Sequence, residues 1–389
     1  MITKIVIPLL LAILLTWLYI DRHCLKHLLK KRWHHILWWS PAIIMAVATL
    51  LLGTSRNFAP DNITIINIYL FMVGLMVIPA TLYVLCSLTG WMLQRLCHTT
   101  RNYGNIAGVM AVLVSWYILI YGTTRGVSQI TVKQQTYCSD QLPDAFDGYR
   151  IVHFSDAHVG TYSGRHAHLL AQAVDSINAQ RADLIVFTGD LQNRMPSEIH
   201  PHLSTLSRLH AKDGVISVMG NHDYPHYITA DSSQRRDNLH ETQQLQRSMG
   251  WTLLMNEHIT VHRHADSIIV AGMENDGTGK PFPSYGNIRK TLQGTQPRQF
   301  VVMLQHDPNV WQEKIVPDGR VQLTLSGHTH AGQVSVFGLR FTQLTAHNDY
   351  GLYNQGRQQL YVTSGLGGVV AMRFGATAEI AVITLHKTK

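Results

Sequence analysis

The 389-residue sequence contains few cysteines and few charged side chains. Charged residues make up only 14% of the chain, and the four cysteines are Cys24, Cys86, Cys97 and Cys138. The spacing of these cysteines matches neither a thiolate zinc site nor a disulfide framework, which excludes both as the basis of the fold. Cysteine usage does not decide the redox compartment. No internal repeat or low-complexity run occurs in the second part of the chain.

The formal net charge of +8 raises the question of nucleic-acid binding. The arginines of the second part are scattered, however, and no stacked aromatic or groove-binding motif accompanies them. Other basic residues stand in short loops between apolar segments, where membrane topology accounts for them. We therefore expect no nucleic-acid partner.

Long apolar runs dominate residues 1–122. Four of them approach the length of a membrane span, namely Ile5–Ile20, Ile36–Gly53, Ile63–Leu88 and Ile106–Tyr121. Tryptophan and tyrosine cluster at their ends, as expected of residues at a membrane interface. The first run has no small-residue cleavage site, so we expect a retained helix and not a signal peptide. The sequence predicts a four-helix transmembrane region over residues 1–122, anchored in the lipid bilayer.

Lysine and arginine predict the orientation of these spans. The loop after the first span is strongly basic and the loop after the third carries Arg95 and Arg101, whereas Arg56 is balanced by Asp61 in the loop between the second and third. This pattern predicts a multi-pass protein of the cytoplasmic (inner) membrane with its second part on the extracytoplasmic side. Arg125 after the last span weakens the bias. A transporter is disfavoured because the spans contain few charges.

The second part alternates between strand and helix patterns. Residues 123–148 are interpreted as a connector, and residues 149–389 as one α/β domain. A β-α-β-α-β order implies parallel strands with right-handed crossovers. The elements expected here are strands at 149–154, 183–187 and 215–219 and helices at 164–179 and 197–209. A helix over 232–249 and closely spaced later strands predict a second sheet packed on the first, with helices outside.

Five of the predicted strands end in Asp, Asn or His. The residues are Asp156 and His158, Asp190, the run Asn221-His222-Asp223, His306, and His328 with His330. Each alone could be a turn, a cap or a buried histidine, but open α/β sheets bind ligands beyond the carboxyl ends of their strands. Carboxylate and amide oxygens mixed with imidazoles suit Mn, Fe or Zn better than Ca or Mg. The combination predicts a dinuclear metal site.

In order and spacing, these five blocks resemble the signature of calcineurin-like metallophosphoesterases. The segment from Gly351 to Gly367 is similar to the bacterial, membrane-anchored branch, and Ala157 stands where leucine is more usual. The resemblance implies a four-layer α/β/β/α sandwich that holds two divalent ions, with manganese favoured and zinc, iron or magnesium as the other options. It implies one metal on Asp156, His158 and His330, a second on Asn221, His306 and His328, and Asp190 bridging both. It also implies that His222 protonates the leaving oxygen and that Asp223 orients His222.

Two such ions can share a bridging hydroxide and clamp the phosphoryl oxygens during in-line attack. The expected activity is hydrolysis of a phosphodiester or pyrophosphate bond, and the membrane anchor suggests a lipid-linked substrate. A phosphomonoesterase acting on proteins or nucleotides and a non-catalytic membrane sensor or scaffold are the alternatives. Four residues near the motifs are either substrate contacts or solvated loop positions, namely Arg194, His202, Tyr224 and His226. The sequence indicates neither the substrate nor the oligomeric state.

Overall fold

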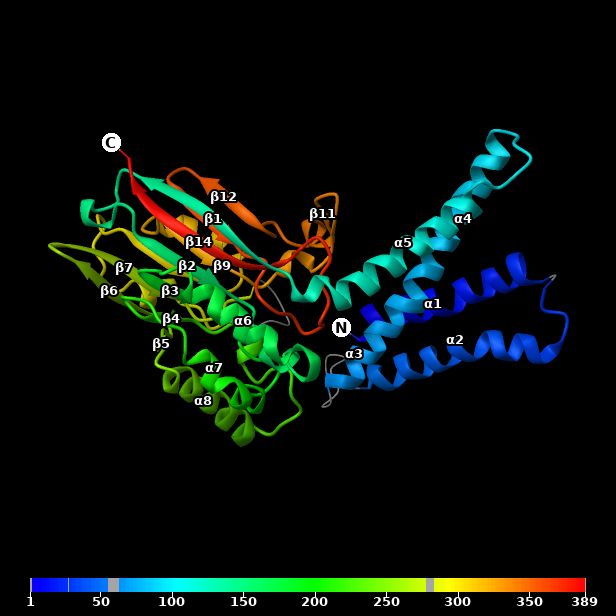
Figure 1. The fold of residues 1–389 in the computed structure, drawn as a ribbon, viewed down its shortest axis with the longest axis horizontal. Coiled ribbons are helices and arrows are strands. Elements are labelled where there is room, and N and C mark those ends of the chain that lie inside the picture. The colour runs from blue at the N-terminus through cyan, green and yellow to red at the C-terminus, as the bar shows by residue number, and fades with distance from the viewer. Residues whose placement is uncertain (1, 27, 55–62, 278–282, 389) are drawn as a thin grey trace. The chain divides into compact units, whose positions relative to one another are not determined.

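The computed structural model describes residues 2–26, 28–54, 63–277 and 283–388 (Figure 1). The chain divides into two compact units, one of residues 1–122 with 227–229 and one of residues 123–226 with 230–389. Each unit is described by itself. Arg56 and Asp61, whose charges entered the orientation prediction, lie outside the described residues.

The first unit is helical. Its α-helices are α1 (Ile2–Ile20), α2 (Arg32–Gly53), α3 (Ile63–Met72), α4 (Ile78–Leu96) and α5 (Gly104–Thr124). π-Helical turns follow α1 at Asp21–Leu25 and join α3 to α4 at Val73–Val77. The described residues therefore form four segments long and apolar enough to cross a membrane, which confirms the predicted number of spans. The third is longer than predicted and ends at Leu96.

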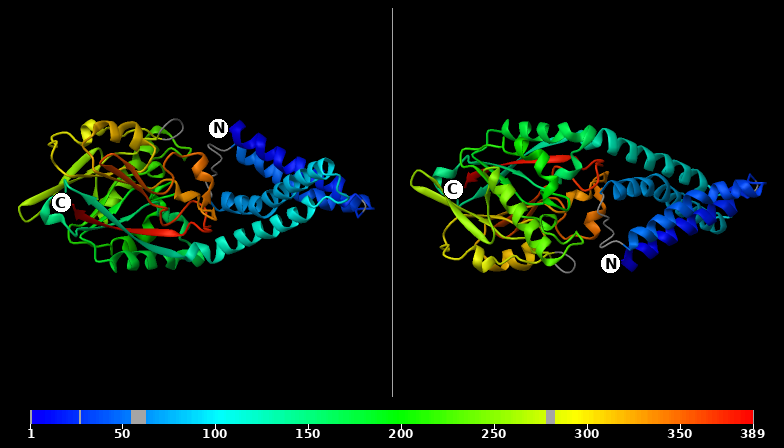
Figure 2. Two further views of the ribbon diagram at one scale, coloured as in Figure 1. Left: turned by 90° about the horizontal axis from the view of Figure 1, so that it is seen from above. Right: turned by 90° about the horizontal axis from the view of Figure 1, so that it is seen from below.

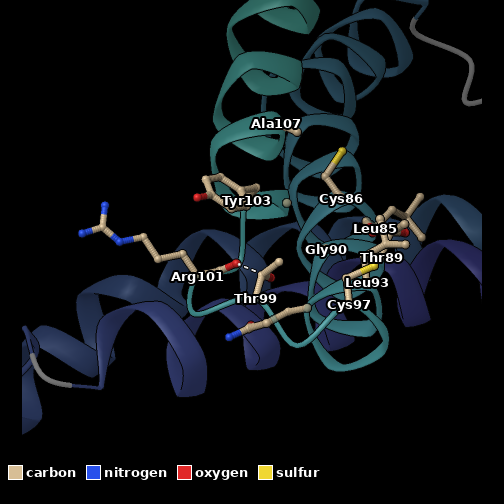
Figure 3. Close-up of a pocket in the computed structure, with 12 residues that line it drawn as sticks. Leu85, Cys86, Thr89, Gly90, Leu93, Cys97, Thr99, Arg101, Tyr103 and Ala107 are labelled. Atoms are coloured by element: carbon tan, nitrogen blue, oxygen red, sulfur yellow. Dashed lines mark hydrogen bonds between the residues drawn. The ribbon is translucent and has the colours of Figure 1, made fainter.

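Glycines allow α4 and α5 to approach closely. A Cβ atom on Gly90 would lie 2.4 Å from the Cα atom of Gly104, and such small residues let membrane helices pack backbone to backbone. Beside this contact an apolar groove of about 560 Å³ is lined by Leu85, Leu93 and other residues of both helices (Figure 3). It is a feature of the membrane unit and contains none of the predicted metal ligands.

The second unit contains two six-stranded sheets. Their orders are β1-β14-β2-β3-β4-β5 and β12-β13-β9-β8-β7-β6. The first sheet consists of β1 (Ile130–Ser139), β14 (Ala378–Lys387), β2 (Arg150–Phe154), β3 (Leu184–Phe187), β4 (Val215–Ser217) and β5 (Thr252–Leu253). The second consists of β12 (Gly351–Gln355), β13 (Gln358–Val362), β9 (Leu323–Ser326), β8 (Val301–Leu304), β7 (Asp266–Gly272) and β6 (Glu257–Arg263). Neighbouring strands are parallel except for the β14–β2, β12–β13 and β6–β7 pairs.

The two sheets pack face to face with helices outside. Alternate residues of each strand point to opposite faces, so Ile151 joins the core between the sheets while Val152 joins the core under α6 (Ala167–Asn178). α7 (Leu203–Leu206) and α8 (Ser232–Ser248) lie on that same side. The opposite face is covered by α9 (Ile288–Thr291), a π-helical turn at Trp311–Ile315 and α10 (Val316–Asp318). These helices, yellow and green in Figure 2, lie on opposite faces of the sheets. The predicted α/β/β/α sandwich is confirmed.

Several local predictions need correction. The stretch interpreted as a connector contains β1, which pairs in parallel with β14 over ten residues. The sequence does not predict this edge strand because Lys133 to Thr136 are all polar and little of the strand is buried. The helix expected at 197–209 is broken into 3₁₀ turns and the short α7, since Pro201 removes a backbone donor. β12 was not predicted.

Gly189 provides a test of how tightly the loops between strands pack. Its φ is +95°, and an added Cβ atom would lie 2.3 Å from the Gly220 nitrogen. Gly189→Ala should therefore destabilise the protein by about 2–4 kcal/mol, because backbone strain and a clash combine. Gly148→Ala is the matched control, since Gly148 has φ +80° but open space around it. Thermal unfolding of the full chain in detergent would measure both, and equal losses would contradict the assigned packing.

Candidate metal centre

The predicted ligands converge because their strands end at the same edge of the two sheets. β2, β3 and β4 run parallel in the first sheet, and β8 and β9 run parallel in the second. The loops that follow these strands meet with almost no space between them. A Cβ atom on Gly327 would lie 2.2 Å from an Asp156 carboxylate oxygen, and one on Gly220 would lie 2.2 Å from Asp190 Oδ1. Glycine is required at both positions for the backbones to approach.

Five of the predicted ligands adopt a left-handed backbone conformation. Their φ angles are 51° for Asp156, 46° for His158, 61° for Asp190, 76° for His328 and 53° for His330. Non-glycine residues rarely occupy this region, and such strain concentrates at functional sites. The sharp turns direct these side chains back toward the ends of the strands.

Two groups of three side chains could each hold a metal ion. The first is Asp156, His158 and His330, and the second is Asp190, His306 and His328; the ligand atoms within each group lie within 4.8 Å of one another. Asp190 lies between the groups, because its Oδ2 is 3.2 Å from His306 Nε2 and 3.6 Å from His158 Nε2.

Asn221 completes the second group. Its Oδ1 lies 2.8 Å from His328 Nδ1 and 3.1 Å from His306 Nε2. The structure therefore brings together all seven residues that sequence reasoning proposed as ligands; their assignment to two metal ions stays a prediction.

The chemistry of His158 fits a bound cation. Its imidazole is fully buried and neither ring nitrogen has a hydrogen-bond partner. Burial lowers the pKa of His158 to about 3, so the ring is neutral and offers a lone pair. The pKa of His330 is likewise lowered to about 3, mainly by burial. An unpartnered buried imidazole such as that of His158 costs free energy unless something coordinates it, and a divalent ion would satisfy this ring.

His306 behaves differently. Burial alone would lower its pKa, but the charge of Asp190 and a hydrogen bond to it raise the pKa of His306 to about 10. The pKa of Asp190 is correspondingly held well below its usual value. In the metal-free protein a proton therefore occupies the space between Asp190 and His306, where a cation would otherwise bind.

His222 lies at the edge of this cluster. Its ring centroid is 4.9 Å from that of His158, and its Nδ1 lies 2.6 Å from the backbone carbonyl oxygen of Asn193. The carboxylate of Asp223 instead accepts backbone N–H groups, from Gly220 and from residues 190–192. The carbonyl of Asn193 thus contacts the His222 ring, while Asp223 holds the loop that carries Asp190; that Asp223 orients His222 stays a prediction.

Arg373 is a site residue that sequence reasoning missed. Its buried guanidinium donates hydrogen bonds to the carbonyls of Ser364, Gly365 and Gly367. A Cβ atom on Gly365 would lie 2.6 Å from Asp156 Cβ, so Arg373 fixes a loop that packs directly on a proposed ligand. The run of glycines at 365, 367 and 368 was the only sequence signal.

The four residues near the motifs that were considered as substrate contacts differ in their burial. Tyr224 is buried and its hydroxyl donates to Glu274, which makes it a packing residue. Arg194 is 8% exposed, and His202 and His226 are half-buried. None of the four is therefore a fully solvated loop position.

Two groups of possible metal ligands lie at one edge of the packed sheets, and comparison with known sequences specifies the family. A model described as "Calcineurin-like phosphoesterase" matches residues 149–332, and one described as "Probable Calcineurin-like phosphoesterase, transmembrane domain" matches residues 3–127. The chain belongs to the calcineurin-like phosphoesterase family and is a membrane protein.

Three relatives illustrate the similarity. The chain is 31% identical to an uncharacterized metallophosphoesterase, YkuE, of Bacillus subtilis over 69% of this chain and 90% of that one. It is 29% identical to a zebrafish (Danio rerio) transmembrane protein with a metallophosphoesterase domain, over 72% of this chain and 62% of the relative. It is 26% identical to an uncharacterized metallophosphoesterase of Helicobacter pylori, over 73% of this chain and 71% of the relative.

The protonated state of His306 predicts that metal binding releases a proton. Its pKa of about 10 means that the ring carries a proton at pH 7 when no metal is bound, and a metal must displace that proton. Titration of the chelator-treated full chain with Mn²⁺, by calorimetry in buffers of different ionisation enthalpy, should show release of about one proton per chain. Affinity should fall as the pH is lowered. Binding without proton exchange at pH 7 would contradict this protonation state.

Proposed function

We propose that this membrane protein hydrolyses a phosphodiester or pyrophosphate bond with two divalent ions held at the edge of its sheets. The observation that carries the proposal is the position of Asp190 between the two ligand groups. A carboxylate shared in this way can offset the repulsion between two cations. Metal-dependent phosphoester hydrolysis is the chemistry of the family to which the chain belongs.

Each ligand has a distinct role in this proposal. Asp156, His158 and His330 hold one ion, and Asn221, His306 and His328 hold the other. The absence of thiolates and the mixture of oxygen and imidazole donors favour manganese, with zinc, iron or magnesium as alternatives. Two such ions, when bound, supply an activated water and neutralise charge on the phosphoryl oxygens.

The chain's own residues provide the remaining steps. Because Nδ1 of His222 contacts the Asn193 carbonyl, Nε2 is the nitrogen that would donate a proton to the leaving oxygen. Backbone N–H groups contacting Asp223 hold the 190–192 loop, and Arg373 holds the loop behind Asp156. These contacts fix the ligands before substrate arrives.

The test of catalysis is Asp190→Asn in the full chain, purified in lipid nanodiscs with Mn²⁺. Hydrolysis of bis(p-nitrophenyl) phosphate should fall at least about 100-fold, because the shared ligand has lost its charge. Asp175→Asn, an exposed carboxylate on α6, is the matched control and should keep the parent rate. Undiminished hydrolysis by Asp190→Asn would refute the site. Faster cleavage of p-nitrophenyl phosphate than of the diester would redirect the proposal to phosphomonoesters.

We also propose that residues 1–122 anchor the domain at 149–389 on the extracytoplasmic face of the cytoplasmic membrane. The support is the positive charge of the loops after the first and third spans.

Two exposed natural cysteines test this orientation, Cys97 after α4 and Cys138 in β1. In right-side-out vesicles a membrane-impermeant maleimide should label Cys138 and spare Cys97, and in inside-out vesicles the pattern should reverse. Single Cys138→Ser and Cys97→Ser variants show which of the two cysteines accounts for the labelling. Labelling of Cys97 alone from the outside would place the domain in the cytoplasm.

A further inference from the structure

A hairpin next to the metal centre exposes large apolar side chains to solvent. It consists of β10 (Ser335–Val336) and β11 (Leu339–Arg340) and is followed by a 3₁₀ turn at Phe341–Leu344. We call its four exposed side chains the apolar hairpin patch; their exposed fractions are 101% for Phe337, 73% for Leu339, 73% for Phe341 and 82% for Leu344. No other large apolar side chain described in the second unit exceeds 48%. Soluble surfaces rarely cluster such residues without a binding role.

The backbone under this patch is firmly held. The guanidinium of Arg340 bonds the carboxylate of Asp349, with Nε 2.7 Å from Oδ2, and Thr342 donates to the same carboxylate. The Ser335 N–H donates to the carbonyl of Phe374 at 2.7 Å. The hairpin thus presents its apolar side chains on a fixed support and does not expose them through local unfolding.

The patch is directly connected to the metal centre. β10 begins five residues after the proposed ligand His330, whose Nδ1 lies 3.2 Å from the Gly367 carbonyl. Between them, the side-chain amide of Gln333 donates to the carbonyls of Val370 and Met372. A membrane surface held at the patch would therefore lie next to the loops that surround His330.

The patch also lies at the end of the domain where the chain arrives from its last membrane helix. α5 ends at Thr124 and β1 begins at Ile130, so about 20 Å at most separates the two points. Ile130 pairs with Ala378 of β14. Phe374 and Gly375, only a few residues earlier, form bridges with Val334 at the base of the hairpin. The sheet therefore places the hairpin and the entering chain at one end.

The charge of the segment suits a phospholipid headgroup region. Residues 331–348 contain no Asp or Glu, and Arg340 neutralises the buried Asp349 that follows. The segment thus presents apolar side chains with no exposed carboxylate that anionic headgroups would repel.

We propose that the apolar hairpin patch inserts into the interfacial layer of the bilayer in which the protein is anchored. Inserted there, it holds the metal centre at the depth of lipid headgroups. The substrate would then be an amphiphile whose phosphoester lies at the headgroup level, and this last step rests on the proposed function.

Insertion can be measured on the full chain without any assay of catalysis. The four native cysteines are replaced by serine, Phe337→Cys is labelled with the fluorophore NBD, and the protein is placed in nanodiscs of phosphatidylcholine and phosphatidylglycerol. The emission should shift to shorter wavelength, and lipids with quenchers on their acyl chains should reduce it by about twofold or more. Ala265→Cys, on the exposed β6–β7 turn at the opposite end of the sheet, is the control and should remain water-like and unquenched.

If the probe at position 337 shows the emission typical of an aqueous environment, the proposal is overturned. A shielded probe that does not respond to quencher lipids would also overturn it, because a second copy or another protein would then cover the patch. The consequence for substrate is tested by Phe337→Ser combined with Leu339→Ser. Hydrolysis of an amphiphilic phosphodiester in vesicles should fall about tenfold while that of a water-soluble aryl diester is unchanged. If the parent protein cleaves neither, the proposed function fails, whereas the probe result still decides insertion.

Discussion

The burial of the Asp190 carboxylate is the constraint on which the arrangement of the second unit depends. A carboxylate that is 1% exposed is costly unless it is surrounded by donors or cations. Here the backbone N–H of His222 donates to Oδ1 of Asp190 at 2.8 Å, and the imidazoles of His306 and His158 face Oδ2. These groups come from both sheets, so the carboxylate is stabilised only when the two sheets are packed and their strand ends coincide.

The same requirement explains why the site can contain so much backbone strain. Left-handed residues cost of order 1–3 kcal/mol each, and several occur together at the proposed ligands. The apolar core between the sheets, with residues such as Ile151, Val186 and Val302, is fully buried and stabilises the frame around them. The strained loops therefore need not be stable by themselves. They also leave imidazoles such as His158 in place with unsatisfied ring nitrogens, which binding of a cation would stabilise.

Local sequence signals predicted the structure correctly where a single residue or a short apolar run determines an element. The apolar runs ending in Asp, Asn or His fixed the strands β2, β3, β4, β8 and β9, and with them the edge where the ligands meet. Local signals did not predict features that depend on contacts between residues distant in sequence. β1 is a strand because β14 lies beside it, and Asp223 contacts backbone N–H groups that are remote in sequence. In the sequence Arg373 resembles an ordinary surface arginine. Its role becomes clear only in the fold, where its loop packs on Asp156.

The strand β1, which lies in the stretch interpreted as a connector, changes how the domain begins. A flexible linker of 26 residues would leave the start of the domain unconnected to its sheets. Instead β1 pairs with β14 along its whole length, and β14 pairs with β2, the strand that leads to Asp156. The point where the chain enters the domain and the metal centre are thus two positions in one hydrogen-bonded sheet, separated by a single strand. Because a sheet transmits position through its hydrogen bonds, the distance between the start of β1 and the metal centre is set by strand spacing and not by chain entropy. Under the proposed function, this rigid connection would let the depth of a phosphoester in the membrane contribute to substrate selection beside its chemistry.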